Sequence, residues 1–250
     1  MNKIKEFFRK ELTELKLLFR SVPSWVVALY AVSVVLMNLL ANKEIDTGLD
    51  FLALDSGFLI SWVAFLAMDI IVKRFGPKAS INISIFALFV NLLMCSLFFL
   101  VSKINGNWGE FYNFNDENIN TALNNTIGGS WFVVMGSSIA FITSAIVNSI
   151  LNYLISKLFK KNNLVAFTVS AHVSTFIAQF VDNLLFALIV SQTLFGWTIT
   201  QSLMCALTGA VAELLCEALF SWIGYKVCKK WEREEVGMLY LDYKKEAQAW

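Results

Sequence analysis

Residues 80–101, SINISIFALFVNLLMCSLFFLV, form an unbroken stretch without a charged side chain. A helix needs roughly 20 consecutive apolar residues to cross a hydrocarbon layer about 30 Å thick, and this stretch has 22 residues. It therefore predicts a transmembrane helix. The rest of the chain has the same character, because 57% of its 250 residues are hydrophobic and only 16% are charged, whereas about a quarter of a soluble domain is charged.

Six apolar stretches predict an all-α polytopic membrane protein with six transmembrane helices, for which the lipid bilayer is an obligatory partner. They cover residues 23–41, 54–73, 80–101, 131–157, 164–190 and 196–226. Residues 1–22 predict a basic amphipathic helix on the cytoplasmic surface, since Ile4, Phe8 and Leu12 recur at helical spacing among basic residues. Residues 227–250 predict a charged cytoplasmic tail. Three helices before three helices are also compatible with a 3+3 inverted repeat.

The basic residues predict the orientation of the chain. Eighteen of the 20 Lys and Arg residues lie in the N-terminal segment, the 73–79 and 157–163 loops and the C-terminal segment. The two exceptions are Lys43 and Lys103. Because Lys and Arg concentrate in cytoplasmic loops, this split predicts an even number of crossings with both termini in the cytoplasm.

Several function classes find no support in the sequence. The net charge of +1 gives no basic field for nucleic acid. The four cysteines form no CxxC pair and there is one histidine, so no metal site or cofactor is expected. HExxH, GxSxG and P-loop motifs are absent, which argues against an intramembrane enzyme and against nucleotide hydrolysis by this chain.

Two opposite-side loops are polar. The first is acidic, with Glu44, Asp46, Asp50 and Asp55. The second, residues 102–130, is rich in Asn and ends in Gly128 and Gly129. Its length exceeds what a hairpin needs, so it predicts either a lid or outer helix, or a plain solvated loop.

Acidic residues inside the predicted spans are the main functional signal. An Asp or Lys at a helix centre costs about 2.5 to 3.5 kcal/mol, so four acids would cost roughly 10 to 14 kcal/mol. Such residues persist where they face a partner or a cavity. The chain has four acids, one histidine and six amides in its spans: Asp69, Asp182, Glu213, Glu217, His172, Asn38, Asn91, Asn148, Asn152, Gln179 and Asn183.

The fifth predicted span carries the densest polar face. In residues 174–186, STFIAQFVDNLLF, polar side chains recur at spacings of three and four: Ser174, Thr175, Gln179, Asp182 and Asn183. Most of them therefore lie on one helical face. A face of carboxylate and amide groups can bind the donors and acceptors of a polar solute. Hydrogen bonding between helices is the alternative.

The remaining ionisable residues allow two interpretations each. Asp69 can either pair with Lys73 or Arg74 near the inner end of its span, or act in coupling or gating. Glu213 and Glu217 share one face, and Glu213 is the better substrate candidate because Glu217 approaches the inner interface. His172 is either a packing residue or a proton relay. Asp69, Glu217 and His172 are thus the coupling or gating candidates.

Four blocks of sequence resemble the vitamin-uptake-transporter-like family of queuosine precursor transporters. They are NLLANK (38–43), DIIVKRFG (69–76), SSIAF (137–141) and STFIAQFVDNLLF (174–186), and the resemblance covers roughly residues 30–226. The chain departs from the family at Ala145 and Asn148, where similar sequences carry Gln and Asp. It also has Glu213 or Glu217 where a basic residue is expected.

The resemblance implies import of 7-deazaguanine bases (queuine, preQ1 and preQ0) through the inner membrane, by a secondary or facilitated mechanism. Protons could be coupled through Asp182 or Glu213. The alternative is a substrate-capturing membrane subunit that needs a separate ATPase complex. Ala206 and Ala210 allow close helix packing within one chain or between two, so a homodimer is considered. The substrate-binding candidates are Asp182, Gln179, Asn183, Ser174, Asn38, Asn42, Asn91, Asn148 and Glu213.

Overall fold

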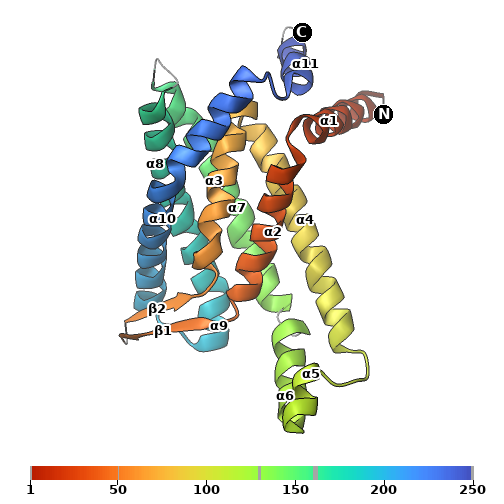
Figure 1. The fold of residues 1–250 in the computed structure, drawn as a ribbon, viewed down its shortest axis with the longest axis vertical. Coiled ribbons are helices and arrows are strands. Elements are labelled where there is room, and N and C mark those ends of the chain that lie inside the picture. Colours follow the sequence, from red (N-terminus) through yellow and green to blue (C-terminus); the bar gives the residue numbers. More distant parts are fainter. Residues whose placement is uncertain (1, 50, 129–130, 160–162, 249–250) are drawn as a thin grey trace.

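The structure is a computed structural model that describes residues 2–49, 51–128, 131–159 and 163–248. In these residues the chain is helical apart from one short hairpin (Figure 1). The elements in chain order are α1 (Asn2–Ser21), α2 (Ser24–Leu40), β1 (Glu44–Leu49), β2 (Leu52–Asp55), α3 (Phe58–Phe75), α4 (Pro77–Ser102), α5 (Gly109–Phe114), α6 (Glu117–Leu123), η1 (Asn124–Gly128), α7 (Trp131–Lys157), α8 (Leu164–Phe186), η2 (Ala187–Ser191), α9 (Gln192–Phe195), α10 (Ile199–Arg233) and α11 (Met238–Gln248).

A helix lies over each of the six predicted stretches: α2, α3, α4, α7, α8 and α10. Among the described residues, four helices are long and apolar enough to cross a membrane, or five if the bent pair α1–α2 counts as one span. The helix α3 holds Asp69, Lys73 and Arg74 within its 18 residues, which lowers its hydrophobicity. The helical membrane protein is thus confirmed, while six crossings and an inverted repeat stay predictions.

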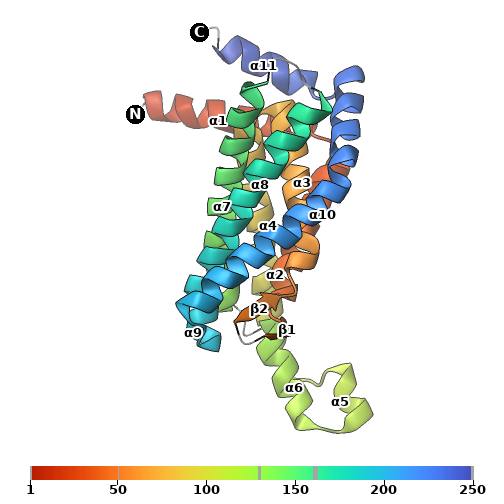
Figure 2. The same ribbon diagram turned by 90° about the vertical axis from the view of Figure 1, so that its left-hand side faces the viewer.

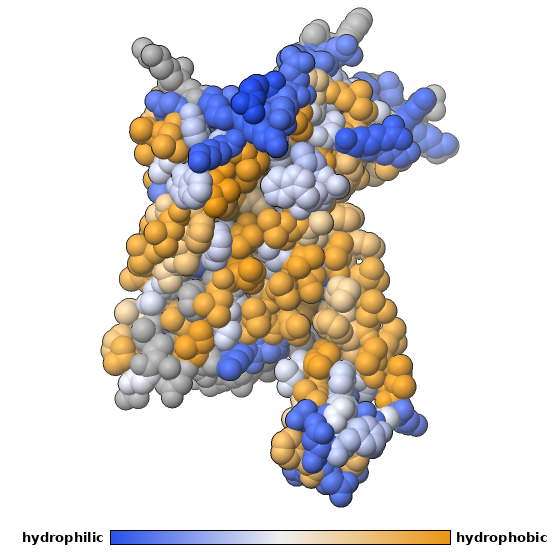
Figure 3. All heavy atoms as spheres, viewed as in Figure 1, coloured by the Kyte–Doolittle hydropathy of each residue, from blue (hydrophilic) through white to orange (hydrophobic). Residues whose placement is uncertain are grey.

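The surface of the bundle is apolar around its middle and polar at its ends. Figure 3 shows an orange band between blue ends, and many large apolar side chains of the bundle helices are exposed, among them Phe89, Leu215 and Leu219. Such a band is suited to lipid rather than water. The polar end with both termini carries α1 and α11 (Figures 1 and 2). Both termini at one end agree with the predicted orientation, whose cytoplasmic side stays a prediction.

The two opposite-side loops both contain secondary structure. The first forms the antiparallel hairpin β1–β2, with Glu44 paired to Asp55. Asp50 and Gly129 lie outside the described residues. The 102–130 segment forms α5 and α6, which project beyond the bundle in both ribbon views (Figures 1 and 2). Asn120 braces this projection, since its Oδ1 accepts from the Trp108 backbone N–H at 2.8 Å. The segment is therefore an outer helical structure.

The interior is closely packed by small residues on facing helices. Ala206 and Ala210 on α10 are fully buried within the chain, so they serve packing inside one protomer. A homodimer stays a prediction without support from this pair of alanines.

Lys160 and Lys161, which contribute to the predicted orientation, lie outside the described residues.

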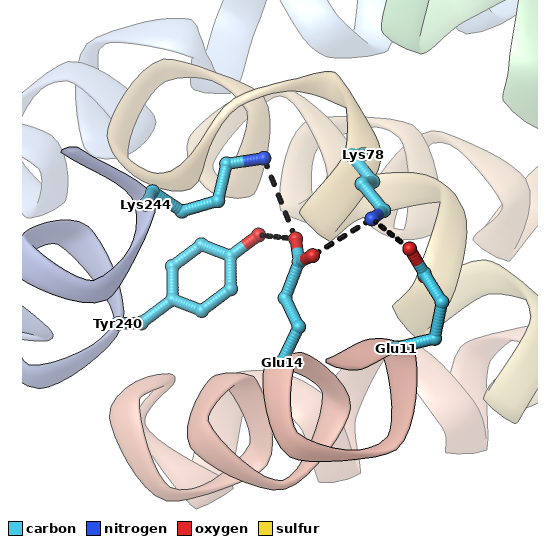
Figure 4. A network of polar contacts seen from close by, with 5 residues as sticks. All are labelled: Glu11, Glu14, Lys78, Tyr240 and Lys244. Carbon is cyan, nitrogen blue, oxygen red and sulfur yellow. Dashed lines mark hydrogen bonds and ion pairs between the residues drawn. The ribbon is translucent and has the colours of Figure 1, made fainter. Parts of the chain in front are cut away.

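The amphipathic helix α1 is joined to α4 and α11 by a cluster of charged groups, which we call the terminal clasp (Figure 4). Glu14 on α1 accepts hydrogen bonds from Lys78 at 2.7 Å, Tyr240 at 3.1 Å and Lys244 at 3.4 Å. Lys78 also donates to Glu11 at 2.9 Å. The Glu14 side chain is only 11% exposed, so its carboxylate depends on these donors instead of water.

The clasp makes this end of the bundle sensitive to acid. Burial alone would raise the pKa of Glu14, but the hydrogen bond from Lys78 and the charges of Lys244 and Lys78 lower it below the ordinary value of 4.5. A carboxyl group with a lowered pKa in the folded state stabilises that state above its ordinary pKa. This contribution is lost as the pH falls through the lowered value.

We expect Glu14→Gln to loosen α11. Losing a charged hydrogen-bond acceptor of this kind costs about 1 to 2 kcal/mol, so hydrogen exchange in α11 should become roughly 5- to 30-fold faster at pH 7. The difference from the parent should shrink as the pH falls well below 4.5. Asp242→Asn, which removes an exposed ion pair within α11, should change the exchange little and is the matched control. Equal exchange in Glu14→Gln and the parent would contradict the role of the clasp.

Candidate functional site

Polar side chains from five helices meet in a cavity at the hairpin end of the bundle. The helices α2, α3, α7, α8 and α10 supply its walls, and its residues are Met37, Asn38, Ala41, Gly57, Ser61, Ser137, Asp182, Asn183, Phe186 and Glu213. The cavity volume is about 30 Å³, on a scale where one water needs roughly 10 to 15 Å³. The cavity is therefore too small for a ring-shaped solute, which requires the helices to move apart.

Two carboxyl groups face this cavity, and each is held by a hydroxyl from another helix. Ser61 on α3 donates to Glu213 Oε1 at 2.5 Å. Ser144 on α7 donates to Asp182 Oδ1 at 2.9 Å. Glu213 is almost fully buried. Because each carboxylate is oriented by a hydrogen bond across helices, the two acids are positioned acceptors for the N–H groups of a solute.

Two amides complete the polar wall. The Asn38 amide donates to the Val34 carbonyl at 2.8 Å, and its oxygen accepts from the Ser137 hydroxyl. Asn183 lies against Gly209 of α10, where an added Cβ would come 2.6 Å from Asn183 Nδ2. The Asn183 amide nitrogen is buried and has no hydrogen-bond partner among the described residues. Asn38 is thus a structural member of the wall, and Asn183 retains a donor for a solute.

Gln179 lies one helical turn before Asn183. Its side chain is fully buried, and within the described chain neither amide atom has a hydrogen-bond partner. A buried amide without partners is unfavourable by about 1 to 3 kcal/mol. Gln179 is therefore a second amide whose hydrogen-bonding capacity the closed bundle leaves unused.

A second polar cluster, which we call the Asp69 cluster, lies next to the cavity toward the end with the termini. Asp69 Oδ1 accepts from Asn148 at 3.0 Å and from Asn152 at 2.6 Å, both on α7. Thr175 on α8 lies 3.4 Å from Asp69 Oδ2. The carboxyl group of Glu217 on α10 adjoins Asp69 and Thr175. All five side chains are fully buried.

The structure shows the partners of Asp69 and the surroundings of Glu217. The hydrogen bonds of Asp69 come from α7, while Arg74 donates instead to the Val236 carbonyl at 2.8 and 2.9 Å. The Glu217 side chain is fully buried beside Asp69, and its approach to the inner interface stays a prediction. Lys73 reaches Asp69 through electrostatic attraction.

The other predicted site residues lie away from the cavity. Ser174 donates to the Ala171 carbonyl of its own helix at 3.0 Å. Asn42 donates to the carbonyls of Asn38 and Leu39 at 3.2 and 3.1 Å. Asn91 and Asn42 border a smaller hollow with Cys95, which adjoins the cavity because Asn38 lines both. The half-buried His172 imidazole lies against the backbone of Glu217.

The sequence did not identify two serine residues whose hydroxyl groups contact the cavity acids. Ser61 and Ser144 orient the two cavity acids, yet a serine in an apolar helix usually bonds to its own backbone and gives little signal. One pattern was available on α7, where Ser144, Asn148 and Asn152 recur every four residues. That spacing puts them on one face, which is the face that meets Asp69 and Asp182.

Among the described residues, no group of three or more His, Cys, Asp and Glu side chains could hold a metal ion. The cavity instead offers two acceptor carboxylates, an amide donor and the Phe186 ring. This set can bind a neutral or cationic planar solute by hydrogen bonds and ring contact.

Comparison with known proteins places the chain in a family. Residues 55–227 match the family described as "Putative vitamin uptake transporter". The matched segment contains α3, α7, α8 and most of α10, and thus both carboxyl groups of the cavity and the whole Asp69 cluster. No curated protein and no solved structure matches the chain. Because the match covers about two thirds of its length, this membrane protein belongs to the vitamin uptake transporter family.

Proposed function

We propose that the chain imports queuosine precursors or salvage bases, namely queuine, preQ1 or preQ0, by a secondary or facilitated mechanism. The observation that supports this proposal is the meeting of Asp182, Glu213 and Asn183 in one cavity. A 7-deazaguanine presents adjacent N–H donors and a carbonyl on one edge. Carboxylates suit the donors, and the Asn183 amide suits the carbonyl.

The ring of such a base is planar and largely apolar. Phe186 lies in the cavity wall beside Asp182 and Asn183, so it can cover one face of the ring. Asp182 is the first residue to which we assign the N–H edge, because its carboxylate is already oriented by Ser144. Glu213, held by Ser61, takes the second place.

The small volume of the cavity supports transport by movement of the bundle. A volume of about 30 Å³ holds a few waters and no base. Uptake therefore requires a state in which the helices separate on one side, as in alternating access. A larger hollow, lined among others by Lys73, Arg74 and Tyr153, lies toward the end with the termini.

Asp182→Asn tests the substrate assignment. Cells that lack their own transporter would receive the parent or the variant, and initial uptake of labelled queuine and preQ1 would be measured at equal membrane expression. Losing a charged hydrogen-bond acceptor should lower uptake roughly 10- to 100-fold. Asp242→Asn, on the exposed part of α11, should transport like the parent. Equal uptake by Asp182→Asn and the parent would remove the assignment.

Competition by unlabelled bases tests the chemistry of recognition. 7-Deazaguanine should compete with labelled queuine, whereas 7-deazahypoxanthine, which lacks the exocyclic amino group, should compete far less. If the site hydrogen-bonds this amino group, binding of the analogue leaves a buried carboxylate unpaired.

Uptake into liposomes that contain this chain alone distinguishes a transporter from a subunit that needs an ATPase complex.

Gly209→Ala tests the role of Asn183. The added methyl group would displace the end of a flexible side chain, Asn183 Nδ2, which lies 2.6 Å from its position. The fold should survive, while uptake weakens about fivefold, which corresponds to one neutral hydrogen bond of about 1 kcal/mol. Val211→Ile, which adds one methyl group on the exposed side of the same helix, is the matched control. Unchanged uptake in Gly209→Ala would show that Asn183 does not contact the solute.

A further inference from the structure

The Asp69 cluster has more acceptors than donors. Asp69 already accepts the two amide groups of Asn148 and Asn152. Four buried oxygens then have no hydrogen-bond donor among the described residues: both carboxyl oxygens of Glu217 and the amide oxygens of Asn148 and Asn152. Turning either amide around would place its oxygen against the Asp69 carboxylate, so the deficit cannot be repaired by rotation.

The cluster also has a surplus of negative charge. Asp69 on α3 and Glu217 on α10 are neighbouring carboxyl groups with no solvent exposure. The ammonium group of Lys73 attracts the Asp69 carboxylate electrostatically. The same ammonium group lies over the Phe167 ring, with Nζ 5.8 Å from the ring centroid. The other ionisable groups that face the pair are Glu213 and Cys228 on α10 and His172 on α8. Two adjacent buried carboxylates cannot both remain charged without a compensating cation.

We propose that Asp69, Glu217, Asn148, Asn152 and Thr175 bind one monovalent cation, a proton or a sodium ion, whose movement drives that of the solute. A proton would lie between the two carboxyl groups. A sodium ion would be coordinated by carboxylate, amide and hydroxyl oxygens, the ligand type that hard cations prefer. Within the pair itself, the two carboxylates with Lys73 nearby leave about one negative charge to neutralise, while Glu213 one turn away is held by Ser61 in the cavity. The inference rests on the proposed transport function.

The position of the cluster gives a physical basis for coupling. Glu217 lies one turn after the cavity acid Glu213 on α10, and Thr175 lies one turn before Gln179 on α8. The cation is bound where α3 and α10 approach each other, since Asp69 and Glu217 come from these two helices. Without the cation, repulsion between the carboxylates favours separation of the helices. The cation thus binds the closed state more tightly than the open one, which is the requirement for shifting their equilibrium.

The test uses liposomes that contain the purified full chain, with the membrane potential held at zero. Labelled queuine uptake is measured without a gradient, with a tenfold inward sodium gradient at equal pH, and with a tenfold inward proton gradient at equal sodium. The parent should accumulate queuine up to about tenfold with one of the two gradients, the limit for one-to-one coupling. In Asp69→Asn and Glu217→Gln the ratio of uptake with and without that gradient should fall to one. Glu110→Gln, an exposed acid of α5, should retain the parent ratio.

The proposal would be overturned if queuine uptake by the parent were the same with and without each gradient. It would also be overturned if both variants kept the gradient ratio of the parent. A second measurement does not depend on the solute. If sodium is the bound cation, the unfolding temperature of the parent in detergent should rise when choline chloride is replaced by sodium chloride. If the proton is the bound cation, the unfolding temperature should change with pH at constant salt. Neither variant should show the response of the parent. If the parent binds a cation in this measurement but transports no deazaguanine, the proposed substrate fails and the cation site stands.

Discussion

The fold depends on one constraint, which is that hydrocarbon cannot solvate a charged or hydrogen-bonding group. Each buried polar side chain must therefore find its partners inside the bundle. Asp69 meets this demand through two amides on α7, and the cavity acids meet it through Ser61 and Ser144 on neighbouring helices. These contacts fix which faces of α3, α7, α8 and α10 turn inward. The apolar band on the outside follows from the same requirement.

The helices themselves were predictable from the sequence. Long apolar runs have a single stable solution in a bilayer, so each of the six stretches is helical. Their ends were less predictable, because α4 begins at Pro77 and α10 continues to Arg233. The hairpin β1–β2 was not anticipated, since its residues have acidic character and no clear alternation. The blocks of sequence predicted the family, and membership of the vitamin uptake transporter family is confirmed over residues 55–227, while the queuosine precursor group within it stays a prediction.

The site was predictable in its acids and not in its partners. Asp182, Asn183, Glu213 and Asn38 lie in one cavity, because a carboxylate or amide in a span must face inward. The mutual positions of α3, α7 and α10 depend on contacts between residues 79 to 152 positions apart. The sequence therefore could not show that Asp69 binds α7 amides instead of Lys73, or that Glu217 is buried beside it. The spacing of residues along a helix shows which side chains share a face, and it does not show which other helix that face contacts.

The terminal clasp has a consequence for biosynthesis. Glu14 and Lys244 are separated by 230 positions, so this partner of the first helix is synthesised long after it. Until α11 has been made, Lys78 on α4 is the partner available to Glu14. The end of the bundle that carries α1 is therefore completed only after α11 has left the ribosome, which makes closure of this end a late step in folding.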